Sequence, residues 1–378
     1  MFKNVTDTVF YVGVDDKNID LFENQYIVPN GIAYNSYVIM DEKIAVMDMV
    51  DAKCADQWFA NVAEVLGDRQ PDYLIISHLE PDHSANLGDV LAKYPDIKIV
   101  SNAKLFGMLP NFFEVPVAEG QTLSLGSHTL QFFMAPMVHW PEVMVTYEQS
   151  EKILFSADAF GKFGTLDTDE DWACEARRYY FNIVGKYGMP AQALLRKAAG
   201  LDIQKICALH GPILTENLEY YIGKYQLWST YTPEDEGIFI AYCSLHGNTE
   251  KAAKKLAEIL EAKGAPKVAI SDLSRDDMAE CIEDAFRYDR LVLAAPTYDG
   301  GVMPVMADFI NHLKMKAYQK RKVAFIENGS WAPMAAKLMK EQMSAMKDIE
   351  IVDEHVTIRS AFKQSDVAAL EALAGKLL

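Results

Sequence analysis

Four side chains that can bind metal ions lie within one short stretch of the sequence. The stretch from His78 to His83 reads HLEPDH, and it follows the apolar run 73–77, which is typical of a buried strand. Imidazole nitrogens and carboxylate oxygens are ligands for metals of intermediate hardness, and a loop at a strand end can gather them around an ion. A solvated surface cluster is the alternative, but it would usually contain Lys or Arg and would not follow a buried strand. We therefore interpret the stretch as metal-binding.

Three further candidates, His139, Asp158 and His210, each end another apolar run. Taken singly, each is more often a hydrogen-bonded structural residue than a ligand. Taken with the HLEPDH stretch, they indicate one site, because strand ends of one sheet converge on the same edge. The remaining histidines outside the loops discussed below are interpreted as structural or solvated: His128, His312 and His355.

A second constellation lies in the C-terminal part of the chain and could bind a phosphate. The loop SLHGNT joins a predicted strand to a predicted helix, so hydroxyl and amide groups and free helix N–H groups can form an anion cradle. It lacks the Lys of a nucleoside triphosphate loop and is not Gly-x-Gly-x-x-Gly, which favours a single phosphate monoester. Its residues are Ser244, Leu245, His246, Gly247, Asn248 and Thr249.

Two more loops follow the next strands at their carboxyl ends, where ligands of doubly wound sheets bind. Tyr298 and Trp331 could flank a planar ring. Turns with incidental aromatic residues are the alternative. The candidate residues of these loops are Pro296, Thr297, Tyr298, Asp299, Gly300 and Gly301, and Asn328, Gly329, Ser330 and Trp331.

Strands and helices must position these residues, and the hydrophobic pattern that predicts them changes near the polar segment 231–237. Before it, short apolar runs outnumber helical stretches. After it, five strands alternate with five helices, which predicts a doubly wound parallel sheet. We therefore expect two domains, 1–232 and 237–378. The predicted strands include 34–40, 44–49, 73–77, 97–101, 130–135, 153–157 and 206–209, then 238–243, 267–271, 290–295, 322–327 and 350–358. The predicted helical stretches include 56–66 and 175–199, the latter interrupted by Gly185, Gly188 and Pro190, then 248–263, 276–286, 303–314, 332–346 and 365–378.

Composition limits the classes of function. The 378 residues are half hydrophobic, enough for two cored domains. The formal charge of -18 argues against binding nucleic acid or an anionic membrane surface. Neither a leader nor a membrane-spanning apolar run is found, so a cytoplasmic protein is expected. The five cysteines form no Cys-x-x-Cys pair, which excludes a zinc ribbon or rubredoxin-type site and favours small buried residues in a reducing compartment.

The metal candidates resemble the dinuclear site of the metallo-β-lactamase fold. That site uses a His-x-His-x-Asp-His loop followed by a His, a bridging Asp and a last His. Here Glu80 replaces the second loop histidine, a variant that marks the flavodiiron branch and whose added carboxylate favours iron over zinc. The resemblance implies an N-terminal αββα sandwich with two irons bridged by Asp158. It assigns one iron to His78, Glu80 and His139 and the other to Asp82, His83 and His210.

The three loops of the C-terminal part resemble the FMN-binding loops of flavodoxin, so the resemblance covers essentially the whole chain. It implies a flavodiiron protein in which electrons pass from an external donor to FMN and then to the diiron site. The expected reaction reduces dioxygen to water or nitric oxide to nitrous oxide, with dioxygen favoured although the sequence does not decide between the gases. A zinc hydrolase and a pure electron carrier with a structural metal are the rival interpretations.

The family resemblance also implies partners and further residues. The FMN of one subunit is expected to serve the irons of its neighbour in a head-to-tail homodimer or homotetramer. Because the chain carries no appended rubredoxin or flavin reductase, its donor is expected to be a separate protein such as rubredoxin, or a reduced deazaflavin. Tyr180 and Trp331 are expected near the gas site, with a buried helix aromatic as the alternative for Tyr180. Phe22 stands where some members have a histidine.

Overall fold

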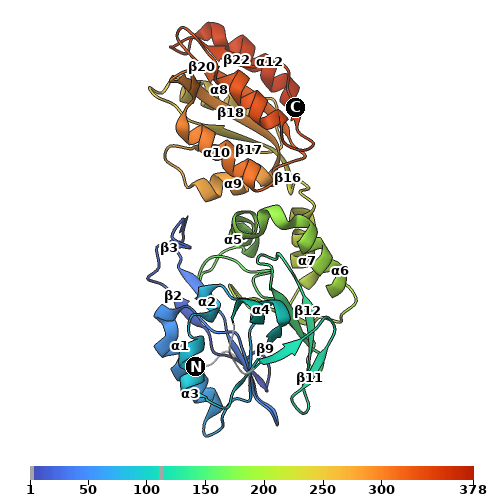
Figure 1. Cartoon of the computed structure of the whole chain (residues 1–378). Coiled ribbons are helices and arrows are strands. Elements are labelled where there is room, and N and C mark those ends of the chain that lie inside the picture. Colours follow the sequence, from blue (N-terminus) through green and yellow to red (C-terminus); the bar gives the residue numbers. More distant parts are fainter. Residues whose placement is uncertain (1–3, 110–113) are drawn as a thin grey trace. The chain divides into compact units, whose positions relative to one another are not determined.

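The computed structural model describes residues 4–109 and 114–378. The chain forms two compact units that divide between Gln226 and Leu227 (Figure 1). The predicted fold class, an N-terminal metallo-β-lactamase-like αββα sandwich followed by a flavodoxin-like parallel sheet, is confirmed.

The first unit contains two mixed sheets. The first has the strand order β1 (Val9–Tyr11), β6 (Tyr37–Ile39), β7 (Ala45–Met47), β8 (Tyr73–Ile75), β9 (Lys98–Asn102) and β10 (Glu114–Val117). The second has the order β11 (Thr122–Ser124), β12 (Thr129–Met134), β13 (Met144–Glu148), β14 (Ile153–Phe155) and β15 (Lys205–Cys207). Strands β14 and β15 are parallel, and helices α5 (Trp172–Tyr179) and α6 (Gly188–Ala198) lie in the connection that a parallel pair requires.

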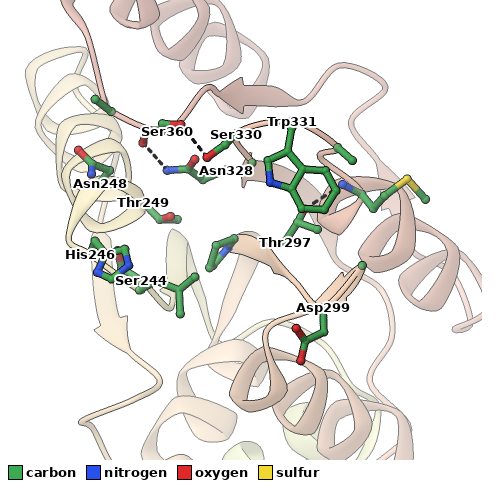
Figure 2. A pocket seen from close by; sticks show the side chains of 17 residues that line it. Ser244, His246, Asn248, Thr249, Thr297, Asp299, Asn328, Ser330, Trp331 and Ser360 are labelled. Carbon is green, nitrogen blue, oxygen red and sulfur yellow. Dashed lines mark hydrogen bonds between the residues drawn. The ribbon is translucent and has the colours of Figure 1, made fainter.

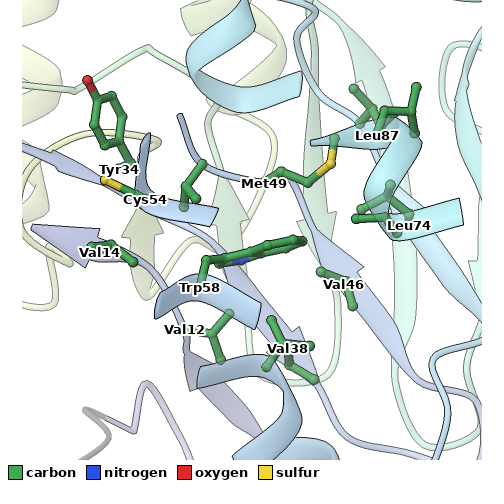
Figure 3. Packing of buried hydrophobic residues seen from close by; sticks show 14 of the residues in the cluster. Val12, Val14, Tyr34, Val38, Val46, Met49, Cys54, Trp58, Leu74 and Leu87 are labelled. Atoms are coloured by element: carbon green, nitrogen blue, oxygen red, sulfur yellow. The ribbon is translucent and has the colours of Figure 1, made fainter. Parts of the chain in front are cut away.

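Alternating side chains of the first sheet build two separate cores. Ile39, Met47 and Ile75 point to one face and pack in a cluster with residues of the second sheet. Val38, Val46 and Leu74 point to the other face, where they pack in a cluster with helices α1 (Ala55–Leu66) and α3 (Leu87–Lys93) (Figure 3). This period of two is what a sheet buried on both faces requires, and it makes the sheet the centre of a layered unit.

Two predicted elements of the first unit are interrupted. The predicted strand 34–40 is split into β5 (Ile32–Tyr34) and β6, because Asn35 leaves the sheet and its side-chain amide donates to Ala208 O and Gly211 O, both at 2.8 Å. The helical stretch 175–199, which was predicted to be interrupted, is divided into α5 and α6 by a π-helical turn, η2 (Tyr180–Val184), and a 3-10 turn, η3 (Gly185–Tyr187). Glycine weakens a helix, and this break coincides with Gly185 and Gly188.

Short elements complete the first unit and were not predicted individually. They are β2 (Val14–Asp16), β3 (Leu21–Phe22), β4 (Tyr26–Ile27), η1 (Ala52–Cys54), α2 (Pro81–Ser84), α4 (Ala103–Met108) and α7 (Leu218–Ser229), the last of which extends into the second unit.

The second unit is built on a parallel sheet with the order β17 (Val268–Asp272), β16 (Asp235–Tyr242), β18 (Tyr288–Tyr298) and β20 (Lys322–Asn328). The predicted last strand, 350–358, is two short strands, β21 (Glu350–Ile351) and β22 (Val356–Ile358), which pair with opposite ends of β20. His355 therefore lies between strands and not within one. A short strand, β19 (Gly301–Val302), pairs antiparallel with the end of β18.

Helices cover both faces of this sheet, as the doubly wound prediction requires. Helices α8 (Asn248–Ala262) and α12 (Val367–Leu377) share one core with Ile240, Val292 and Ile326 of the sheet. The remaining helices are α9 (Met278–Arg287), α10 (Pro304–Met315), α11 (Ala335–Ser344) and the 3-10 turn η4 (Gln364–Asp366).

The segment that joins the units is held by the second one. The buried guanidinium of Arg321 donates to Tyr231 O and to Tyr288 O, both at 2.7 Å. The indole of Trp228 donates to Glu234 Oε2 at 2.7 Å. Packing thus assigns residues 227–232 to the second unit, and the limits 1–232 and 237–378 remain a definition proposed from the sequence.

Two expectations drawn from composition concern the cysteines and the membrane. Cys54, Cys207, Cys243 and Cys281 are buried as predicted, but Cys174 is exposed because it lies on the outer side of α5. Among the described residues, no helix is both long and apolar enough to cross a membrane.

Trp58 is expected to be the largest single contributor to the core between the first sheet and α1. It is 1% exposed, whereas Trp331 of the second unit is 88% exposed. Replacing Trp58 by Ala should lower the free energy of unfolding of the first unit by about 3–5 kcal/mol, because the cavity would be lined by packed side chains. Trp331→Ala should change the free energy of unfolding by less than about 0.5 kcal/mol. Denaturant unfolding of the metal-free protein measures both, and equal effects would contradict the packing described here.

Candidate functional site

The metal-binding candidates stand at the ends of strands of the first unit. His78 follows β8, Asp158 follows β14 and His210 follows β15, while His139 lies between β12 and β13. Glu80 precedes α2, a single helical turn that contains Asp82 and His83 and begins with Pro81 at its first position. Proline fixes the backbone angle needed to start a helix, so this turn directs two adjacent side chains of the loop into the site. All are buried except Glu80, whose side chain is 15% exposed.

The structure brings all seven side chains together in two groups. The first group consists of His78, Glu80, His139 and Asp158, and the second of Asp82, His83 and His210. Within each group the potential ligand atoms lie within 4.8 Å of one another. In the first group Glu80 Oε2 lies 3.2 Å from His78 Nε2 and 3.1 Å from His139 Nε2. In the second, Asp82 Oδ2 lies 3.2 Å from His83 Nε2 and 3.4 Å from His210 Nε2.

Asp158 lies between the two groups and presents one carboxylate oxygen to each. Its Oδ2 is 3.5 Å from His78 Nε2 and 3.4 Å from His139 Nε2. Its Oδ1 is 3.5 Å from His83 Nε2 and 3.6 Å from His210 Nε2. This is the arrangement expected of a carboxylate that bridges two ions.

The polar atoms at the centre of the cluster suit metal ions. Within residues 4–109 and 114–378, both carboxylate oxygens of Asp82, both of Asp158 and Nε2 of His139 are buried and make no hydrogen bond. Burying polar atoms in this state is costly unless a ligand or metal satisfies them. The set contains imidazole and carboxylate but no thiolate, a mixture that suits iron and other metals of intermediate hardness. The residues therefore fit two metal ions.

The cluster is strongly polarised by its buried carboxylates. Burial opposes a charge on His78, but hydrogen bonds to Glu142 and Glu80 outweigh burial and raise the pKa of His78 to about 10. Asp82 and Asp158 outweigh burial at His83, and Asp158 and Glu80 outweigh it at His139. The pKa of each of these two histidines is therefore raised to about 9. Burial also opposes ionisation of Asp158, yet the imidazoles of His139 and His83 beside its two oxygens hold its pKa well below the usual value. The site thus favours positive charge at its centre.

Residues behind the cluster fix its histidines. His78 Nδ1 lies 2.8 Å from Glu142 Oε1, and His210 Nδ1 lies 2.8 Å from Ala33 O. Sequence reasoning missed Glu142, although it follows His139 by three residues. The spacing between His139 and Glu142 does not indicate this contact, because Glu142 pairs with His78, which belongs to a loop distant in the sequence.

Aromatic rings close one side of the site. Phe22, Tyr179 and Tyr34 pack on the His210 ring with centroid distances of 5.4, 5.5 and 5.9 Å. Tyr180 packs against Tyr225 and Phe181 at 5.1 and 5.2 Å, whereas its neighbour Tyr179 packs on the ring of His210. The catalytic role of Tyr180 stays a prediction. The histidines interpreted as structural or solvated, His128, His312 and His355, lie outside both metal-binding groups.

The second unit contains a cavity of about 580 Å³ at the carboxyl ends of its strands (Figure 2). All three predicted loops line it, through Ser244, Leu245, His246, Asn248, Thr249, Pro296, Thr297, Asp299, Gly300, Asn328, Gly329, Ser330 and Trp331. The predicted residues Gly247, Tyr298 and Gly301 do not line it directly. Ala332, Met334, Ser360 and Ala361 also line it and were missed. Ser360 and Ala361 follow β22, so the rule that ligands bind at strand carboxyl ends could have found them.

One end of the cavity is suited to a phosphate. Gly247 adopts φ 78° and directly precedes α8, so the first-turn N–H groups of the helix are open. Ser244 Oγ is buried there and makes no hydrogen bond. No Lys or Arg lines the cavity, so an anion would be held by N–H and hydroxyl donors and the helix dipole.

The other loops are tied to one another before any ligand binds. Thr297 Oγ1 accepts hydrogen bonds from Met334 N and Ala335 N at 2.8 and 3.1 Å. Asn328 Nδ2 donates to Ser360 O at 3.0 Å, and Ser360 Oγ donates to Ser330 Oγ at 2.7 Å (Figure 2). Trp331 stands at the edge of the cavity and is 88% exposed. The cavity therefore joins a phosphate cradle to a broad slot for a planar ring.

Comparisons with known proteins agree with both sites. Residues 32–211 match the ODP family of beta lactamases, and residues 239–365 match the flavodoxin domain. A nitric oxide reductase of Moorella thermoacetica is 29% identical over 371 residues, which cover 93% of this chain and 91% of that protein. An uncharacterized protein of Methanocaldococcus jannaschii is 28% identical over 377 residues, covering 96% of this chain and 95% of that protein.

Solved structures extend the likeness to the whole chain. Rubredoxin oxygen:oxidoreductase of Desulfovibrio gigas aligns with a TM-score of 0.92 and 25% identity, covering 100% of this chain and 98% of that one. The flavodiiron protein of Giardia intestinalis shares the fold with a TM-score of 0.91 and 22% identity, covering 100% and 96%. With an ODP-type lactamase domain followed by a flavodoxin domain, and seven side chains in the first unit that could hold metal ions, the chain has the domain organisation of the flavodiiron proteins.

Proposed function

We propose that this protein is an oxidoreductase that reduces dioxygen to water, nitric oxide to nitrous oxide, or both. Electrons would pass from an external donor to FMN in the second unit and then to two irons in the first. The observation that carries the proposal is the position of Asp158, one oxygen of which faces each half of the buried cluster. A hydrolytic enzyme would have no use for a flavodoxin domain with a cavity at the ends of its strands, which the same chain contains.

The proposed ligand set follows the two groups. His78, Glu80 and His139 would hold one iron, Asp82, His83 and His210 the other, and Asp158 would bridge them. When bound, the irons would supply the binding positions for the gas and, with FMN, the electrons. The carboxylate Glu80 favours iron over zinc because it makes the site harder and more anionic. Phe22 and Tyr179 would exclude water from the His210 side, since both rings pack on that imidazole.

The cavity of the second unit would bind FMN through the three loops. The phosphate would lie against Ser244, Gly247 and the first turn of α8. The buried hydroxyl of Ser244 and the first-turn N–H groups of the helix would donate hydrogen bonds to it. The isoalloxazine ring would lie between the loops that contain Thr297 and Asn328, with Tyr298 or Trp331 beside it. Neither aromatic ring is buried, so each is free to adjust to the ring.

Two relatives support different substrates. The Moorella thermoacetica relative is named a nitric oxide reductase, whereas the Desulfovibrio gigas structure is that of a rubredoxin oxygen:oxidoreductase. We therefore propose both gases as substrates, with dioxygen favoured. The donor is proposed to be a separate protein such as rubredoxin, or a reduced deazaflavin.

The decisive experiment measures both gases side by side. Iron-loaded, FMN-loaded protein is reduced without oxygen, and consumption of dioxygen and of nitric oxide is followed in separate samples. We expect turnover of at least one gas. Asp158→Asn should lose that turnover, because an uncharged amide cannot replace the negative carboxylate that would bridge the two cations. A colourless zinc protein that hydrolyses esters would support the hydrolase, and a yellow protein without iron would support the electron carrier.

Gly247 provides a test of the FMN site. Gly247 and Gly264 have φ values of 78° and 84°, and they lie at opposite ends of α8. Alanine at either should destabilise the fold by about 1–2 kcal/mol, since a side chain disfavours this conformation. Only Gly247→Ala should weaken FMN binding, by about tenfold or more, because relieving the strain would move the phosphate-binding amides. Fluorescence titration of FMN into the apoprotein measures this, and an equal loss in Gly264→Ala would refute the assignment.

We propose in addition that the active form is a head-to-tail homodimer or homotetramer, in which Trp331 of one subunit lies near the irons of the other. The exposed indole of Trp331 supports this arrangement. Specific activity should therefore fall when the protein is diluted until it dissociates, as followed by light scattering. Full turnover by a dilute monomer would show that transfer between subunits is not needed.

A further inference from the structure

The two halves of the metal cluster differ in the groups that support their histidines from behind. His78 directs Nε2 toward Glu80 and Asp158, so Nδ1 is its outer nitrogen. That nitrogen lies 2.8 Å from the carboxylate oxygen Oε1 of Glu142. Both side chains are fully buried. A buried carboxylate thus contacts a histidine of the first group.

Among the described residues, no carboxylate is hydrogen-bonded to the outer nitrogen of a histidine in the second group. His210 directs Nε2 toward Asp82 and Asp158, and its outer nitrogen Nδ1 lies 2.8 Å from the neutral carbonyl of Ala33. The outer nitrogen of His83 is buried and, within the described part of the chain, makes no hydrogen bond. The asymmetry therefore concerns charge as well as geometry.

Glu142 is held in place by contacts other than His78. Its Oε1 also accepts a hydrogen bond from Leu79 N at 3.0 Å, and its backbone oxygen accepts one from Asn102 Nδ2 at 2.6 Å. Its second carboxylate oxygen is buried and has no hydrogen-bond partner among the residues that the structure describes. A negative charge fixed in a medium of low dielectric, and shared with few donors, acts strongly on the imidazole beside it.

We propose that Glu142 is a positioning residue that makes the two ion positions unequal, so that the ion held by His78, Glu80 and His139 binds more tightly than the ion held by Asp82, His83 and His210. A carboxylate that accepts the outer N–H of an imidazole fixes its tautomer and ring orientation and increases its strength as a ligand. The first position would have such support, and the second would have only a backbone carbonyl. The inference rests on the proposed two-ion site.

The test is a titration of the full-length metal-free protein with Co²⁺ under anaerobic conditions, in competition with a chromophoric chelator. The wild type should bind two ions in a tight and a weaker step. Glu142→Gln keeps an oxygen that can accept from His78 but removes the charge, and it should weaken the tight step by about 10- to 100-fold while the weaker step changes little. Glu142→Asp keeps the charge on a shorter side chain and should recover part of the affinity.

Glu148 provides a matched control. It is also a buried glutamate, in β13, and it accepts hydrogen bonds from Ser150 N and Glu151 N, residues outside both metal-binding groups. Glu148→Gln should leave both binding steps as in the wild type, even if it lowers the temperature of thermal unfolding.

The outcomes separate this inference from the proposed function. Unchanged binding in Glu142→Gln, or equal weakening of both steps, would overturn the role of Glu142 while leaving the two-ion site intact. Loss of affinity in Glu148→Gln that matched the loss in Glu142→Gln would also overturn it, since the effect would then come from folding. A wild type that binds only one Co²⁺ would instead refute the two-ion site on which the proposed function depends.

Discussion

The burial of one carboxylate, that of Asp158, is the constraint on which the first unit depends. An isolated buried charge is costly, and this one is offset by four histidines that approach its two oxygens from three loops. Only His78 and His83 share a loop, the HLEPDH stretch. With the loop of Asp158 itself, the sandwich must therefore hold four loops at one edge, where the proposed metal ions would add positive charge.

The loops are held in place by residues that are not themselves candidate metal ligands. Asn35 interrupts a strand so that its amide can bind the carbonyls of Ala208 and Gly211 on either side of His210. Pro81 starts the single turn that places Asp82 and His83 side by side. Trp58 and the alternating apolar residues of the first sheet fix the strands beneath these loops. The rigidity of the site is thus supplied by ordinary packing and by backbone hydrogen bonds.

The second unit solves a different electrostatic problem. Its cavity is lined by His246 and Asp299 but, among the described residues, by no Lys or Arg, so an anion there would rely on backbone N–H groups, hydroxyl groups and the dipole of α8. The candidate metal cluster of the first unit gathers three carboxylates and four histidines, whereas the cavity lining contains one of each. Under the proposed function, the carboxylates would hold cations in the first unit, and uncharged donors would hold the phosphate of FMN in the second.

The sequence by itself determined the order of the two modules, the doubly wound sheet and the candidate residues of both sites, since strand ends, the HLEPDH turn and the Gly247 loop are local patterns. It did not determine Glu142 or the contact of Tyr179 with His210. Each of these depends on side chains that are far apart along the chain and meet only in the folded unit. The break at Asn35 was likewise decided by tertiary hydrogen bonds, to the carbonyls of Ala208 and Gly211, that outweigh local strand propensity. The interruption near 180–187, by contrast, could be expected from the local glycines Gly185 and Gly188.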